Sequence, residues 1–121
     1  MNEKTVPKDS VWYVDRWVVG LKLVRDKMPE NWNKEKYGEH PKFGIADDEQ
    51  FGALLKKKLL EEVAEYSAKG ELEELVDALE LIYAISANEG VTPKELERMR
   101  LEKREKKGGF DGRLTWEGQQ K

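Results

Sequence analysis

The fold is decided by residues 60–82, LEEVAEYSAKGELEELVDALELI, in which a glycine divides two acidic, leucine-rich helical patterns. Apolar residues recur at helical spacing on both sides of Gly70, and a glycine after a helix commonly adopts the left-handed conformation that ends it. The segment therefore predicts two antiparallel helices joined at Gly70. Of the acids on either side of the predicted turn, five are considered as a group: Glu61, Glu62, Glu65, Glu74 and Asp77.

Capping signals predict the bounds of three helices. The first begins near Asp47, with Gln50 as its capping-box partner, and runs to about residue 68. The second covers about residues 71–88, and the third starts at Thr92, has Glu95 as a second capping-box partner, and ends in the basic run KREKK. Residues 29–46 contain two prolines and two glycines and predict a loop, whereas residues 11–28 fit a helix or a strand.

The composition predicts one all-α domain whose core is completed by oligomerisation. The chain has 121 residues, of which 39% are charged and only 38% hydrophobic, which is a lean supply for a core. The second helix is nevertheless apolar almost all round, a pattern typical of a buried helix. We therefore expect a helical hairpin that self-associates as a dimer or tetramer.

Charge and hydropathy exclude several classes of protein. The 22 basic and 25 acidic residues give a net charge of −3, which argues against a nucleic-acid binder. The absence of cysteine excludes disulfides and thiolate metal sites. No apolar run reaches the ~20 residues of a membrane span and the N-terminus has no hydrophobic signal core, so we expect a cytoplasmic protein without membrane contact.

Helical geometry separates the five acids. On a wheel of about 100° per residue, Glu62 lies about 20° from Leu55 on the apolar stripe, and Glu65 follows it on the same side. Glu61 points nearly away from the core. Glu74 and Asp77 lie on the same side of the second helix as Leu81, where solvent is not their obvious destination.

Folding the hairpin at Gly70 brings four of these carboxylates together. Glu65 faces Glu74 and Glu62 faces Asp77, because the members of each pair lie equally far from the turn. Such a cluster suits a hard divalent cation such as Mg²⁺ or Mn²⁺. A solvated acidic face balanced by the neighbouring lysines at 56–58 is the competing interpretation, and spacing alone leaves both open.

Four segments together resemble the all-α nucleotide pyrophosphohydrolases of the MazG superfamily, closest to the phosphoribosyl-ATP pyrophosphohydrolase-like branch. The acidic signature consists of E-E-x-x-E at 61–65 and E-x-x-D at 74–77. The other three segments are KLVRDKMPE at 22–30, FGALLKKKLLEEVAEY at 51–66 and KREKKGGFDGRL at 103–114. The resemblance implies a MazG-like domain over residues 21–117, preceded by an extension at 1–20 and followed by a tail at 118–121.

The resemblance also implies a function and a set of site residues. Nucleotides would be hydrolysed to a monophosphate and pyrophosphate with Mg²⁺, which would neutralise developing charge and activate a water. The implied metal ligands are Glu62, Glu65, Glu74 and Asp77, with Glu61 as a peripheral member of the catalytic group. Hydrolysis of phosphoribosyl-ATP in histidine biosynthesis is an alternative, although Tyr83 is followed by Ala84 where those enzymes tend to carry histidine.

Basic and aromatic residues are the candidates for binding the substrate. Phosphate groups need fixed cations, and the candidates are Lys22, Arg25, Lys58, Lys107 and Arg113. A wall for the base would come from the aromatic residues Trp12, Trp17, Trp32 and Phe51. A non-catalytic helical interaction or regulatory module is the main alternative, and it has no need of converging acids.

Overall fold

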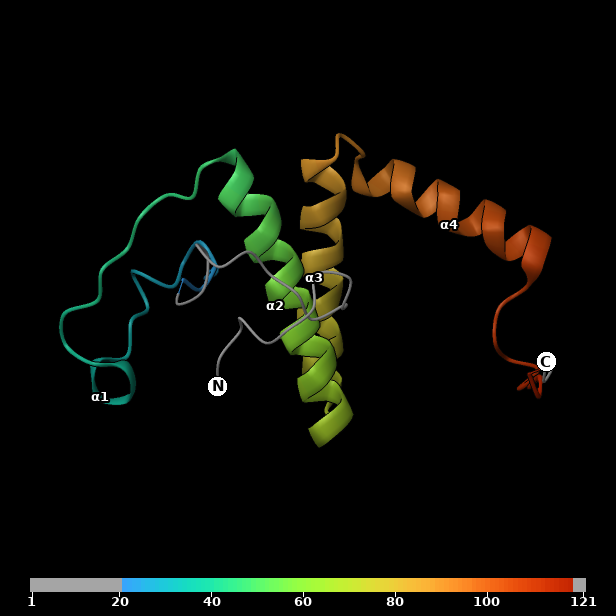
Figure 1. The fold of residues 1–121 in the computed structure, drawn as a ribbon, viewed down its shortest axis with the longest axis horizontal. Coiled ribbons are helices and arrows are strands. Elements are labelled where there is room, and N and C mark those ends of the chain that lie inside the picture. The colour runs from blue at the N-terminus through green and yellow to red at the C-terminus, as the bar shows by residue number, and fades with distance from the viewer. Residues whose placement is uncertain (1–20, 119–121) are drawn as a thin grey trace.

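The computed structural model describes residues 21–118, and this part of the chain contains four helices and no strand. They are α1 (Lys34–Tyr37), α2 (Asp48–Lys69), α3 (Leu72–Asn88) and α4 (Pro93–Lys107), as Figure 1 shows. The predicted all-α class is confirmed for these residues. The question of helix or strand at 11–20, the proposed extension at 1–20 and residues 119–121 of the tail lie outside the described residues.

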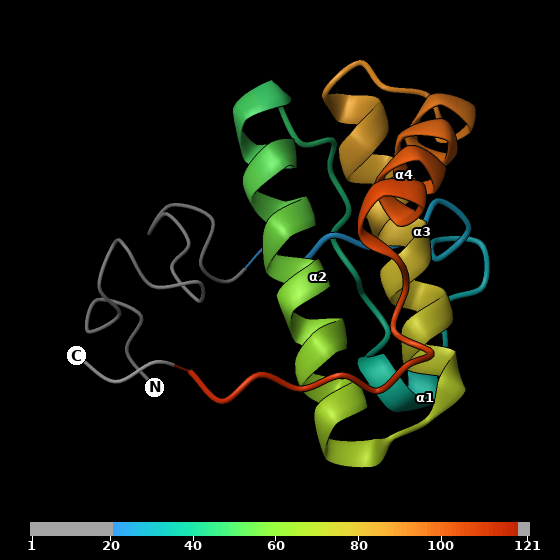
Figure 2. The ribbon, with the colours of Figure 1, turned by 90° about the vertical axis from the view of Figure 1, so that its right-hand side faces the viewer.

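The α2–α3 hairpin forms as the sequence predicts. The Asp47 carboxylate accepts a hydrogen bond from the Gln50 backbone N–H at 2.8 Å, and the Gln50 side chain accepts one from the Asp47 N–H at 3.2 Å. This reciprocal capping box fixes the start of α2. Gly70 ends the helix with φ +69°, and its N–H donates to the Tyr66 carbonyl. The two helices then run side by side in both views (Figures 1 and 2).

Helix α4 leaves the hairpin after a short connection. Its cap is Thr92, whose hydroxyl accepts from the Glu95 N–H at 3.1 Å, and Pro93 occupies the first turn. The helix has no buried residue and projects away from α3 (Figure 1). Ion pairs within it, Arg98 with Glu102 and Arg100 with Glu97, support a helix that has little to pack against.

The segment 29–46 is more ordered than the predicted loop, because it contains the single-turn helix α1. Asn33 caps α1 by accepting from the Lys36 N–H. The Trp32 ring lies 5.2 Å from that of Tyr37 and 5.4 Å from that of Phe43, and its Nε1 donates to the Gly38 carbonyl. Contacts among aromatic residues, which the proline and glycine content did not reveal, therefore organise this segment.

The core is thin, and no other element of residues 21–118 covers one face of α3. Leu54, Leu55 and Leu81 are the buried hydrophobic residues of the described chain. Within one chain α2 covers one side of α3 and α4 turns away, so the nearly all-round apolar surface of α3 is not fully buried. The exposed hydrophobic residues of α3 are Leu72, Leu75, Val76, Leu79 and Ile82. No helix in the described range is long and apolar enough to cross a membrane.

Candidate metal centre

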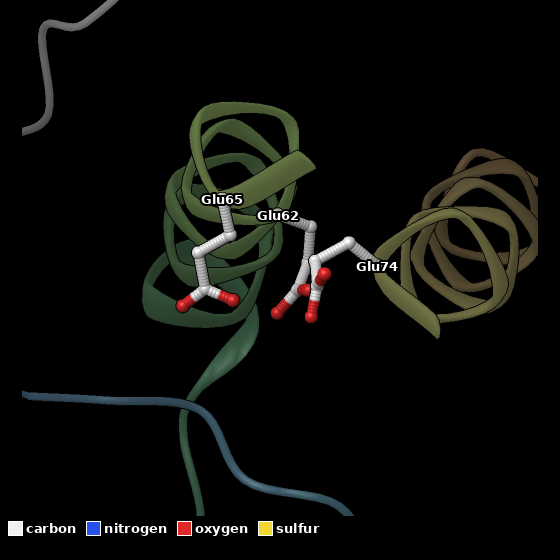
Figure 3. A group of neighbouring side chains, drawn as sticks. All are labelled: Glu62, Glu65 and Glu74. Atoms are coloured by element: carbon white, nitrogen blue, oxygen red, sulfur yellow. The ribbon is translucent and has the colours of Figure 1, made fainter. Parts of the chain in front are cut away.

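Three carboxylates converge between α2 and α3 near the Gly70 turn. Glu62 and Glu65 project from α2 and Glu74 from α3, and each offers an oxygen within 4.8 Å of those of the other two. Figure 3 shows the Glu62 and Glu74 carboxylates next to each other between the helices, with Glu65 beside them. We call these three residues the acidic trio. The wheel and hairpin geometry predicted all three members.

The trio is buried on one side. Glu62 is 9% exposed and Glu74 is 8% exposed, although both are acids on helices at the surface of a small protein. One oxygen of each, Glu62 Oε1 and Glu74 Oε1, is inaccessible to solvent and has no hydrogen-bond partner among residues 21–118. Buried carboxylates without a partner are costly and are normally found paired or bound to a metal. A solvated acidic face would not bury these two groups, so this observation favours a cation site over that interpretation.

The environment of Glu62 disfavours its charged form. Burial raises the pKa of the Glu62 carboxyl, and the negative charges of Glu65, Asp77 and Glu74 raise it further. The ammonium group of Lys58 opposes this rise in pKa but does not cancel it. A positive ion among these groups would reverse the balance, because it favours the ionised carboxylate.

Asp77, the fourth predicted ligand, is paired with a cation of the chain itself. Its Oδ1 accepts from Arg25 Nη2 at 2.7 Å, and the two side chains are 34% and 57% exposed. Asp77 is close enough for its charge to raise the pKa of Glu62, but it is not part of the acidic trio. The structure therefore brings three of the four predicted ligands together and places the fourth beside them in an ion pair.

Glu61 pairs with Lys22, which lies three residues before Arg25 in the chain. Its Oε1 lies 3.8 Å from Lys22 Nζ, and Lys57 Nζ donates to the Leu21 carbonyl at 3.3 Å. We call residues 21–25 the crossing segment, because they contact both α2 and α3. The expectation that Glu61 points away from the core is only partly right: it lies outside the trio as predicted, but the crossing segment covers it and leaves its side chain 36% exposed.

The other predicted phosphate-binding cations are spread over the molecule. Lys58 is near enough to Glu62 to affect its pKa, and Lys22 and Arg25 contact the carboxylates that flank the trio. Lys107 ends α4 and Arg113 follows it, so both lie on the arm that projects from the hairpin (Figure 1). Within one chain, only the first three cations are gathered at the acids.

Neither of the two described aromatic candidates for a base-binding wall, Trp32 and Phe51, is placed in contact with the trio. Trp32 packs within segment 29–46, and Phe51 is half-buried in the first turn of α2. Trp12 and Trp17 lie outside the described residues. An open apolar hollow of about 280 Å³ lies toward the opposite end of the hairpin from Gly70, and its lining includes Leu55, Leu59 and Ile85 but none of the trio.

The contacts made by the crossing segment do not follow from the sequence pattern. Lys22 and Arg25 are predicted as cations for phosphate, whereas in the structure they pair with Glu61 and Asp77. These partners are distant in sequence (Arg25 and Asp77 are 52 residues apart), so no local periodicity indicates the pairing. The charge complementarity of KLVRDK and the acidic hairpin was the available signal.

No family model, curated protein or solved structure matches this chain.

Proposed function

We propose that this protein is a Mg²⁺-dependent nucleotide pyrophosphohydrolase that cleaves a nucleoside triphosphate, or a related nucleotide, to a monophosphate and pyrophosphate. The observation that carries the proposal is the pair of buried, unpartnered carboxylate oxygens of Glu62 and Glu74, with Glu65 within 4.8 Å. The resemblance of the two acidic motifs to those of MazG-type enzymes supplies the reaction.

The donor set supports a hard divalent cation. All three members of the trio offer oxygen, and Asp77 would supply a fourth carboxylate. Oxygen donors favour Mg²⁺ and Mn²⁺ over softer metals that prefer thiolate or imidazole, so Mn²⁺ is a possible substitute. A divalent cation at this position would neutralise charge on phosphate oxygens and lower the pKa of a water that attacks phosphorus.

The residues of the chain would then bind and orient the polyphosphate. Lys22, Arg25 and Lys58 lie around the acids, so phosphate oxygens would meet positive groups on the rim of the site and the metal at its centre. Glu62, Glu65 and Glu74 would hold the cation from two helices, which fixes its position relative to the rim. This arrangement supplies charge stabilisation and positioning, which dominate catalysis of phosphoryl transfer.

The proposal is tested by metal binding and by product formation. We expect Mg²⁺ and Mn²⁺ to raise the melting temperature of the full chain, while Na⁺ at equal ionic strength does not. A screen of natural and modified nucleotides, with inorganic pyrophosphatase and phosphate detection, should reveal a metal-dependent substrate that yields pyrophosphate. A protein that binds neither divalent ion would contradict the proposal.

Glu61→Gln is expected to lower kcat/KM by less than about tenfold, which is far less than the loss expected for Glu62→Gln. Glu61 lies outside the acidic trio and pairs with Lys22, so its loss leaves the proposed ligands in place. The measurement is kcat/KM for both variants at saturating Mg²⁺. Equal losses would mean that the ligand assignment is displaced by one residue.

We also propose that the protein self-associates through α3. The exposed hydrophobic residues of α3 form an uncovered face, and pairing two such faces across a two-fold axis would bury them. We expect light scattering to give at least a dimer at micromolar concentration, and Leu79→Glu to shift it to a monomer because Leu79 is 49% exposed in one chain. Lys103→Glu on α4 is the matched control and should remain associated. A wild-type monomer would exclude this interface.

The same face favours one alternative function, a helical interaction module without catalysis. Such a module would use the apolar residues of α3 and have no requirement for divalent cations. Metal binding distinguishes the two functions, since only the pyrophosphohydrolase needs the buried acids to be ionised around a cation. A protein that self-associates but binds neither Mg²⁺ nor Mn²⁺ would support the interaction module.

A further inference from the structure

The crossing segment makes three polar contacts within five residues. The Leu21 carbonyl accepts from Lys57 on α2, Lys22 pairs with Glu61 on α2, and Arg25 pairs with Asp77 on α3. In Figure 3 the chain that belongs to the first described residues passes on the side toward which the carboxylates of the trio point. The segment thus carries two positive side chains across the open side of the acids.

Arg25 and Lys22 differ in how closely they approach their carboxylate partners. Arg25 Nη2 is 2.7 Å from Asp77 Oδ1, which is a charge-assisted hydrogen bond. Lys22 Nζ is 3.8 Å from Glu61 Oε1, which is an ion pair without a hydrogen bond, and Glu61 is outside the trio. Arg25 is therefore the cation that binds a predicted metal ligand, Asp77.

We propose that Arg25 is an exchangeable counter-ion of the metal centre. In the metal-free protein it neutralises Asp77, and it leaves Asp77 when a divalent cation binds, so that its guanidinium becomes available to the phosphate oxygens of the substrate. Arg25 thus competes with the metal for Asp77 and is a binding residue for the polyphosphate. This inference rests on the proposed function.

The geometry of the pair supports exchange. An ion pair whose side chains are 57% and 34% exposed is held weakly, because water competes with both partners. The charge of Asp77 already reaches Glu62, so a cation bound by the trio would attract Asp77 and repel Arg25. The planar guanidinium then offers paired N–H donors that match phosphate oxygens as well as carboxylate oxygens.

The first test measures Mn²⁺ affinity by calorimetry on the full chain without nucleotide. Arg25→Gln should bind Mn²⁺ about two- to fivefold more tightly than wild type, since a weak surface competitor for Asp77 is removed. Arg25→Lys keeps the charge and should restore affinity close to the wild-type value. Lys27→Gln removes a charge two residues away and is the matched control, which should leave the affinity unchanged at physiological salt.

The second test uses inorganic triphosphate in the presence of saturating Mn²⁺, so that the unknown base does not matter. Arg25→Gln should bind triphosphate about tenfold more weakly, and Arg25→Lys should lose only part of that affinity, because its single ammonium lacks the paired donors. Tighter metal binding combined with weaker triphosphate binding is the expected result.

The outcomes separate this inference from the proposed function. If wild type binds Mn²⁺ but Arg25→Gln binds it equally or less tightly, Arg25 is a structural brace and the exchange is excluded. If triphosphate affinity is also unchanged in Arg25→Gln, the guanidinium has no role toward phosphate. If wild type binds no Mn²⁺ at all, the proposed function itself is overturned and the exchange with it.

Discussion

Glu62→Gln is expected to raise the melting temperature of the metal-free protein while it removes metal-dependent hydrolysis. Glu62 is 9% exposed, one of its oxygens has no hydrogen-bond partner in the described chain, and burial with three neighbouring acids raises its pKa. Glutamine keeps the shape and removes the charge, so repulsion among the acids decreases. The stabilisation should be about 1 kcal/mol, as is common for substitutions that trade activity for stability.

The loss of activity in Glu62→Gln should be about 10²- to 10³-fold, as for removal of one group that stabilises developing charge. Mg²⁺ should also no longer raise the melting temperature as it does in wild type. Glu73→Gln is the matched control, because Glu73 is exposed on α3 beside Glu74 and belongs to no acidic cluster among residues 21–118. A fall in the metal-free melting temperature of Glu62→Gln would indicate a structural partner for Glu62 and would contradict the metal site.

The raised pKa of Glu62 gives this prediction a pH dependence. Between the ordinary value of 4.5 and the raised pKa, the folded protein retains a proton that the unfolded chain has lost. The associated stability is therefore present below pH 4.5 and is lost as the pH rises through the folded-state pKa. The difference in melting temperature between Glu62→Gln and metal-free wild type should be small near pH 4.5 and grow above it. A difference independent of pH would show that charge on Glu62 is not its cause.

The hairpin and the acidic trio were predictable because their determinants are local. Gly70 supplies the left-handed end of α2, the Asp47–Gln50 capping box supplies its start, and helical spacing places Glu62 on the buried side. Antiparallel folding then brings Glu74 to the same position without any further information. Each step needs only residues within one or two turns of the feature that it explains.

The contacts that cross the chain were not predictable in this way. Residues 21–25 show no clear period, and their position over the acids depends on the pairing of Arg25 with Asp77 and of Lys22 with Glu61. The nearly all-round apolar pattern of α3 indicates that one chain cannot cover it fully, but the pattern does not show which side α4 leaves exposed. The direction of α4 depends on a short connection after Gly90, which the apolar pattern does not encode.

The pairing of Asp77 with Arg25 makes Asp77→Asn the most informative substitution at the edge of the trio. We expect hydrolysis to fall about 10²-fold and Mn²⁺ affinity to decrease, because an anionic ligand is removed. The melting temperature without metal should change little. Loss of an exposed ion pair costs about 0–1 kcal/mol, and the loss is offset as the charge that opposes ionisation of Glu62 disappears. Calorimetry with Mn²⁺ and thermal melting without metal are the two measurements.

The comparison of Asp77→Asn with Arg25→Gln separates a ligand from a structural ion pair. Both substitutions break the same 2.7 Å contact, so if the contact serves only to hold the crossing segment on α3, the two variants should lose stability and metal affinity alike. If Asp77 binds the metal and Arg25 competes for it, Mn²⁺ affinity should decrease in Asp77→Asn and increase in Arg25→Gln. The double variant should then resemble Asp77→Asn, because a competitor has no effect once its target is gone. Parallel losses in both single variants, with hydrolysis retained in Asp77→Asn, would assign the pair to structure and remove Asp77 from the metal site.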